Sequence, residues 1–179
     1  KRQVLGQRYN DFVLVGAGKT AIDAALFLLA NEVSPENIRW VMPRDSWILD
    51  RAHIQPTLDS LGKLFSNQIV PGSESKDIDD FFENIWKAGG LLRIDDAVKP
   101  TMYRCSTVTQ AELKQLKRIN KIVRKGRVKT INENEIVLEE GSIATTLNTL
   151  HIDCAGDGLA KRPPVPIFHN RQITLHSVR

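Results

Sequence analysis

The sequence predicts an α/β fold with a parallel sheet covered by helices. The prediction rests on an apolar run at residues 11–15 that ends in glycine, a helix-forming stretch at residues 18–31, and a second apolar run at residues 37–42. Strand, glycine turn, helix and strand in this order form one βαβ unit, which places the two strands side by side and parallel.

Length and composition fit one domain of this kind. The chain has 179 residues, of which 41% are hydrophobic and 26% charged, so a buried core can form. The net charge of +4 is small, and a basic block at residues 114–129 lies between two acidic blocks, which argues against a nucleic-acid surface. Two cysteines and the lack of a long apolar segment predict a cytoplasmic protein without a membrane partner.

The pattern after the first unit predicts further helices and a change to antiparallel strands. A Pro-Gly-Ser segment at residues 71–73 should separate two helices, and Thr109 with Glu112 matches a capping box at the start of a third. From residue 127 the hydrophobic period changes to two, which predicts a small antiparallel meander. The expected helices are residues 55–67, 77–88 and 109–119, and the expected strands are residues 91–94, 127–131, 135–138, 142–144, 150–154 and 172–178.

The strongest motif lies between the first strand and the first helix. Its residues are Gly16, Ala17, Gly18, Lys19, Thr20 and Ala21, which fit the pattern G-x-G-x-x-G/A. Gly16 permits a tight turn, Gly18 lets the backbone approach a pyrophosphate, and Ala21 lets the helix pack closely on the strand. The start of the helix offers N–H donors to phosphates, to which Lys19 and Thr20 add a cation and a hydroxyl. The motif predicts a Rossmann-like three-layer domain that binds a dinucleotide.

The end of the second strand indicates which dinucleotide is bound. NAD-specific domains place an acidic residue there for the ribose hydroxyls, whereas this chain continues with Arg44. An arginine can form a forked, charge-assisted contact with a 2′-phosphate, so the sequence favours NADP(H). Asp45 leaves NAD open, because its carboxylate would accept a hydrogen bond from ribose if it pointed inward.

This arrangement resembles the NADP-binding half of flavin-containing and Baeyer–Villiger monooxygenases. In those enzymes an arginine, a spacer and a tryptophan follow the second strand, as Arg44 and Trp47 do here. The resemblance implies a 2′-phosphate contact for Arg44 and a packing role beside the cofactor for Trp47. The strand that ends in Ala155 and Gly156 resembles the Ala-Thr-Gly ending of two-dinucleotide flavoproteins, which implies that these two residues also contact the cofactor.

The resemblance also implies a division of the chain and a function. Residues 11–158 would form the NAD(P)-binding domain, residues 1–10 a lead-in segment, and residues 159–179 a linker and the start of a neighbouring FAD-type domain. Because the sequence starts at Lys1 rather than Met, we expect either a trimmed chain or a piece of a longer protein. The chain would position NADPH for hydride transfer to FAD held outside it, and alone it is not expected to turn over.

Two other functions remain open at this point. A stand-alone NAD(P)-dependent dehydrogenase would need a Tyr-Lys or His-Asp set, but neither Tyr9 nor Tyr103 is followed by the required lysine. A non-catalytic sensor of NADP(H) would need no such set. The four histidines have no spaced partners that indicate a metal site or a catalytic triad, so we predict no catalytic residue and no metal.

Overall fold

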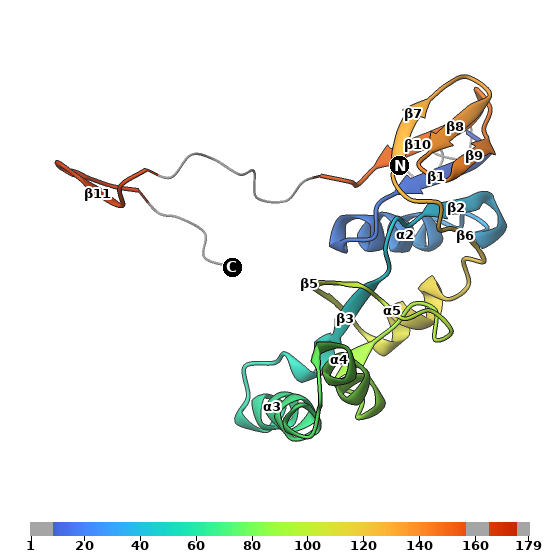
Figure 1. The fold of residues 1–179 in the computed structure, drawn as a ribbon. Helices are drawn as coiled ribbons and strands as arrows, with labels where there is room; N and C mark the ends of the chain where they lie inside the picture. The colour runs from blue at the N-terminus through green and yellow to red at the C-terminus, as the bar shows by residue number, and fades with distance from the viewer. Residues whose placement is uncertain (1–8, 157–164, 175–179) are drawn as a thin grey trace.

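A four-stranded parallel sheet forms the centre of the protein, in the strand order β10-β1-β2-β6. The computed structural model describes residues 9–156 and 165–174. Helix α2 connects β1 to β2, which confirms the βαβ unit predicted from the sequence (Figure 1). The bounds of these elements are β1 (Asp11–Val15), α2 (Lys19–Ala30), β2 (Ile38–Val41), β6 (Lys121–Val123) and β10 (Thr149–Asp153).

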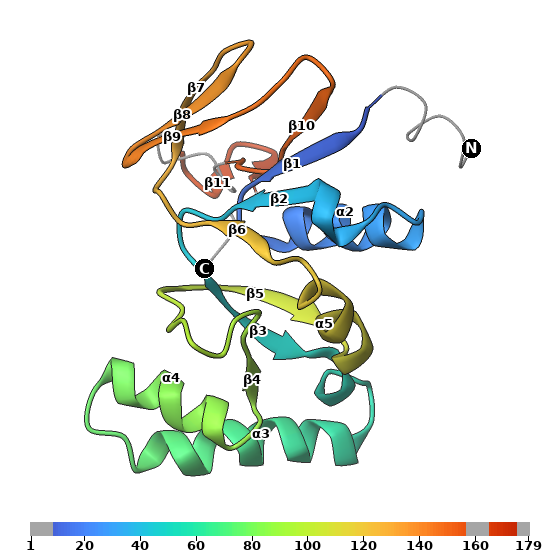
Figure 2. The same cartoon turned by 90° about the vertical axis from the view of Figure 1, so that its right-hand side faces the viewer.

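Alternate side chains of β1 face two different layers. Phe12 and Leu14 share a core with α2 and with α5 (Gln110–Leu116), whereas Val13 and Val15 pack against strand β8 of the antiparallel meander. Helices on one face and the meander on the other give three layers, so the predicted α/β, Rossmann-like class is confirmed (Figure 2). The meander consists of β7 (Val128–Ile131), β8 (Glu135–Leu138) and β9 (Gly141–Ala144).

A second sheet is inserted in the chain between β2 and β6. Its middle strand β3 (Ser46–Asp50) pairs antiparallel with β4 (Leu91–Leu92) and parallel with β5 (Met102–Val108). Helices α3 (Leu58–Ser73) and α4 (Ile78–Lys87) cover this inserted sheet on the side away from the parallel sheet (Figure 2). Short 3-10 helices precede β2 at Pro35–Asn37 and follow β3 at Arg51–His53.

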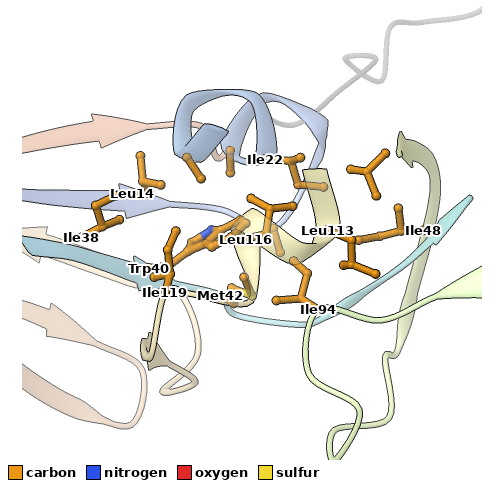
Figure 3. Packing of buried hydrophobic residues seen from close by; sticks show 14 of the residues in the cluster. Leu14, Ile22, Ile38, Trp40, Met42, Ile48, Ile94, Leu113, Leu116 and Ile119 are labelled. Atoms are coloured by element: carbon orange, nitrogen blue, oxygen red, sulfur yellow. The ribbon is translucent and has the colours of Figure 1, made fainter. Parts of the chain in front are cut away.

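One hydrophobic cluster joins the two sheets. Leu14 and Trp40 come from the parallel sheet and Ile48 from the inserted sheet, and all three are fully buried in the same core (Figure 3). Leu113 and Leu116 of α5 lie in this core as well. The inserted sheet is therefore packed onto the parallel sheet and its helices rather than joined to them by the chain alone.

The structure corrects the prediction that the helix from residue 55 ends at residue 67. Helix α3 continues to Ser73 with Pro71 inside its last turn. The hydroxyl of Ser73 donates to the carbonyl of Val70, and that of Ser75 donates to the carbonyl of Pro71. These side chains supply donors to the last turn, where helix carbonyls lack backbone partners. The Pro-Gly-Ser segment is therefore tolerated.

Strands β3, β5, β6 and β11 were not predicted, and the last predicted strand is shorter than expected. Strand β12 (Gln172–Ile173) pairs with β11 (Phe168–His169), and residues beyond 174 lie outside the described part of the chain. The helices at residues 77–88 and 109–119, the meander and the returning strand β10 are confirmed. Within the described residues, no helix is long and apolar enough to cross a bilayer.

Candidate functional site

A cavity of about 900 Å³ lies at the carboxyl ends of β1, β2 and β10. Residues 16–20 of the glycine motif line it, together with Arg44 after β2 and Ala155 and Gly156 after β10. Ligands of open α/β sheets bind at this edge, and the volume lies in the range of about 300–1,000 Å³ that is typical of ligand pockets. The structure therefore brings most of the predicted cofactor-binding residues into one site.

One backbone and one side-chain hydrogen bond hold Gly16 at the centre of this edge. Its N–H donates to the carbonyl of Val41 over 2.9 Å, and its carbonyl accepts from the indole Nε1 of Trp40 over 2.7 Å. The φ angle of Gly16 is +119°, and a Cβ built there would lie 2.8 Å from the carbonyl oxygen of Cys154. Gly16 is required both by its backbone conformation and by the close approach of the backbone that follows β10.

The N-terminus of α2 faces the cavity without a capping side chain. Gly18 occupies the N-cap position, and the first turn contains no acidic residue. A Cβ built at Gly18 would have no heavy atom of the described chain within 4 Å, so the space beside this backbone is open. Ala21 is fully buried and packs α2 on the core, as the motif predicts. This end of the helix can therefore present its N–H groups to an anion.

The two polar side chains of the motif have different surroundings. The ammonium group of Lys19 pairs with Asp23 one turn further along α2, and both side chains are partly exposed. Thr20 is exposed and lines the cavity. The pairing reduces the charge that Lys19 offers to a ligand, although a stronger anion would compete with the exposed carboxylate of Asp23.

Positive charge concentrates in the cavity. Arg44, Arg104 and Arg127 line it, whereas the acidic lining consists of Asp153. Within the described residues, these three guanidinium groups make no hydrogen bond or ion pair, although five of the nine described arginines do. Unpaired guanidinium groups in one cavity favour a ligand with several anionic oxygens, because arginine binds phosphate through forked hydrogen bonds.

Arg104 reaches the cavity from a bulge in β5. Trp47 pairs with Tyr103 and the next residue, Ile48, pairs with Ser106, so Arg104 and Cys105 are extra residues in β5. Cys105 has a positive φ of 53°, which is unusual for a residue with a side chain. Bulges often redirect side chains next to functional sites. Arg104 was not predicted from the sequence because the bulge breaks the regular alternation of a strand.

The inserted sheet also supplies a buried hydroxyl to the cavity wall. Ser106 lines the cavity and is 2% exposed, and its Oγ has no hydrogen-bond partner among the described residues. A buried hydroxyl without a partner costs about 1–3 kcal/mol. A polar group in the cavity would offset this cost after a rotation of the serine side chain, which fits a polar ligand better than an apolar one.

Burial favours the neutral form of two titratable groups at this edge, His151 on β10 and Cys154 directly after it. Burial lowers the pKa of His151, whose Nε2 lies 2.8 Å from the hydroxyl of Thr145. Burial also raises the pKa of the Cys154 thiol, with a further contribution from the nearby carboxylate of Asp153. A neutral thiol is a weak nucleophile, so this part of the cavity is suited to binding rather than to covalent chemistry.

Trp47 does not lie beside the cavity as the resemblance implied. It is 2% exposed and stacks on Phe82 of α4, with 5.5 Å between the ring centroids. The guanidinium carbon of Arg93 lies 4.5 Å from the Trp47 ring. Side chains of β3 alternate between two faces, and Trp47 points to the face covered by α4. Its position is therefore in the core of the inserted sheet.

Asp45 is also directed away from the cavity. It is 7% exposed, and its two carboxylate oxygens accept from the Nε and Nη2 atoms of Arg124 over 2.7 and 2.9 Å. This hydrogen-bonded pair raises the pKa of Arg124. Because the carboxylate of Asp45 is held by Arg124, the geometry does not support the ribose contact that would have favoured NAD.

Comparisons with known proteins identify relatives whose names state no activity. The chain is 44% identical over 189 aligned residues to Uncharacterized protein Rv2000 of Mycobacterium tuberculosis (strain H37Rv) and to Uncharacterized protein Mb2023 of Mycobacterium bovis. These alignments cover 98% of this chain and 33% of each relative, so the chain spans about a third of the length of these relatives. No family model and no solved structure matches the chain.

Proposed function

We propose that this chain is the NADP(H)-binding domain of a flavin-dependent oxidoreductase of the monooxygenase type. The observation that carries the proposal is one cavity lined by the glycine loop, the start of α2 and three guanidinium groups, which have no partner in the described part of the chain. A pyrophosphate with a third phosphate on the ribose matches this arrangement, since both the helix N-terminus and arginine favour phosphate oxygens.

The residues present fit such a dinucleotide. Backbone donors between Ala17 and the first turn of α2 would hold the pyrophosphate, and Arg44 would bind the 2′-phosphate at the end of β2. A Cβ built at Gly156 would have no described heavy atom within 4 Å, as at Gly18. The space beside both glycines is therefore open to a ligand. NADPH supplies a hydride when bound, and the chain binds it, orients it and neutralises its charge.

The flavin part of the proposal has separate support. The resemblance of the Arg44 region to monooxygenases implies an FAD held in another domain, and the relatives are about three times as long as this chain, which leaves room for such a domain. Within the described residues, only one strand, glycine loop and helix unit has the dinucleotide pattern. FAD would therefore be held by a separate domain of the longer protein.

Calorimetric titration with NADPH and NADH tests the choice of cofactor. Arg44→Ala should raise the dissociation constant for NADPH about tenfold or more and leave that for NADH almost unchanged, because a hydrogen bond to a charged group contributes about 1.5–3 kcal/mol. Arg171→Ala is the matched control, because Arg171 is exposed, unpaired among the described residues and outside the cavity.

Two results would contradict the proposal. Equal losses for NADPH and NADH would remove Arg44 from the 2′-phosphate, and the absence of binding heat with either cofactor would refute dinucleotide binding altogether. The visible absorption spectrum of a purified full-length relative tests the flavin part. A colourless protein that binds NADPH would instead indicate a plain dehydrogenase or a sensor.

A further inference from the structure

The carbonyl of Gly16 is bound by a tryptophan that does not line the cavity. Trp40 lies on β2, is fully buried and belongs to the main hydrophobic core (Figure 3). Its indole Nε1, which is the only hydrogen-bond donor of the side chain, donates to the Gly16 carbonyl over 2.7 Å. The carbonyl oxygen of Gly16 therefore points into the protein, towards the indole.

The direction of this carbonyl determines the direction of the next N–H group. The described chain contains no cis peptide bond, and in a trans peptide the C=O and the following N–H point in opposite directions. With the Gly16 carbonyl turned into the core, the N–H of Ala17 points away from the core, on the side where Ala17 and Gly18 line the cavity. The Ala17 N–H makes no hydrogen bond within the described residues.

Gly16 itself does not determine this orientation. Glycine has the widest choice of backbone angles, and Gly16 already has a φ of +119°. A rotation of the peptide plane between Gly16 and Ala17 would turn the carbonyl oxygen to the cavity and the N–H inward. A carbonyl oxygen at that place would repel phosphate oxygens, whereas an N–H group attracts them.

We infer that Trp40 is a positioning residue that turns the Ala17 N–H towards an anionic oxygen of the ligand by holding the Gly16 carbonyl in the core. The inference rests on the proposed dinucleotide site and names the ligand group as a phosphate oxygen. Trp40 acts through the peptide plane and does not touch the ligand. The glycine loop thereby depends on a residue of the second strand as well as on its own glycines.

Trp40→Phe tests the inference because it keeps an aromatic ring and removes the N–H donor. We expect the dissociation constants for NADPH and for inorganic pyrophosphate both to rise about tenfold or more, as when a hydrogen bond to a charged group is lost. Trp47→Phe is the control, since Trp47 is equally buried but lies in the cluster under α4. Both variants can lose stability, and only Trp40→Phe should lose affinity.

Hydrogen exchange of the unligated wild-type protein, followed by NMR, tests the orientation without a ligand and without a variant. The indole Nε1–H of Trp40 should exchange slowly and the Ala17 N–H quickly, whereas the Gly16 N–H, which bonds to Val41, should exchange slowly. Slow exchange of the Ala17 N–H would overturn the inference. If the wild type binds NADPH, a Trp40→Phe variant with the same affinity would also overturn it. A wild type that binds neither ligand would instead refute the proposed function.

Discussion

Replacement of Gly18 by alanine should separate ligand binding from folding. The backbone at Gly18 has φ −88° and ψ −177°, an extended conformation that alanine adopts without strain. A Cβ at this position would meet no heavy atom of the described chain within 4 Å. We therefore expect the free energy of unfolding to stay the same or to rise by about 0.4–1 kcal/mol, because alanine restricts the unfolded chain more than glycine does.

The added methyl group would occupy the space through which a phosphate approaches the start of α2. Displacement of the phosphate would weaken at least one hydrogen bond to a charged group, which contributes about 1.5–3 kcal/mol. Since 1.4 kcal/mol corresponds to a factor of ten, the dissociation constant for NADPH should rise about tenfold to a hundredfold. Calorimetry with NADPH measures the affinity, and urea unfolding measures the stability.

Gly62→Ala is the matched control for Gly18→Ala. Gly62 lies within α3, outside the cavity, and a Cβ there would also have none of the described heavy atoms outside its own helix turn within 4 Å. Alanine should stabilise this helix by about 0.5–1 kcal/mol and leave the NADPH affinity unchanged. A Gly18→Ala protein that bound NADPH as tightly as wild type would refute the close approach of the pyrophosphate to the glycine loop.

Three further predictions concern the framework of the site. Gly16→Ala should lower the free energy of unfolding by about 1–3 kcal/mol, because the new Cβ would meet the Cys154 carbonyl and the φ angle is unfavourable for alanine. A decrease of less than about 0.5 kcal/mol, measured by urea unfolding, would contradict this prediction. Arg124→Met should lower the free energy of unfolding by about 2–3 kcal/mol in the same assay, because it leaves the buried carboxylate of Asp45 without its partner. An unchanged urea midpoint would show that water replaces the arginine. The N–H of Thr109 holds the pKa of Glu112 below its usual range, so the stabilisation by Glu112 is complete above the ordinary carboxyl pKa and is lost as the pH falls through the lowered one. The stability difference between wild type and Glu112→Gln should therefore shrink as the pH falls below the ordinary carboxyl pKa of about 4.3, and a constant difference would contradict the role of the charge.

The parts of the site that depend on local signals could be predicted from the sequence. The glycine motif lies between a strand and a helix, as its pattern requires, and Arg44 lies at the same edge of the sheet. The capping box of α5 is also confirmed, with the Thr109 N–H donating to Glu112 over 2.7 Å. In each case the residues that determine the structure are near one another in the chain.

The inserted sheet could not be predicted in this way. Strand β5 pairs in parallel with β3, which lies more than fifty residues earlier in the chain. Residues 103–105 of β5 are exposed, and a bulge interrupts the strand there, so neither a buried run nor an alternation of apolar and polar residues marks this strand in the sequence. Arg104 and Ser106 were missed for this reason. Trp47 lies in the core of the inserted sheet and not in the cavity wall, because a spacing carried over from a family does not determine the face of a strand to which a side chain points.

The two walls of the cavity belong to different sheets, and this has a consequence for thermal denaturation. Arg104 and Ser106 come from the inserted sheet, whereas the glycine loop follows the first strand of the parallel sheet. A molecule that contacts both walls links them, so its binding free energy opposes their separation. At a ligand concentration one hundred times the dissociation constant this linkage is worth about 2.7 kcal/mol. Saturating nucleotide should therefore delay the melting of β3, β4 and β5 together with that of the parallel strands.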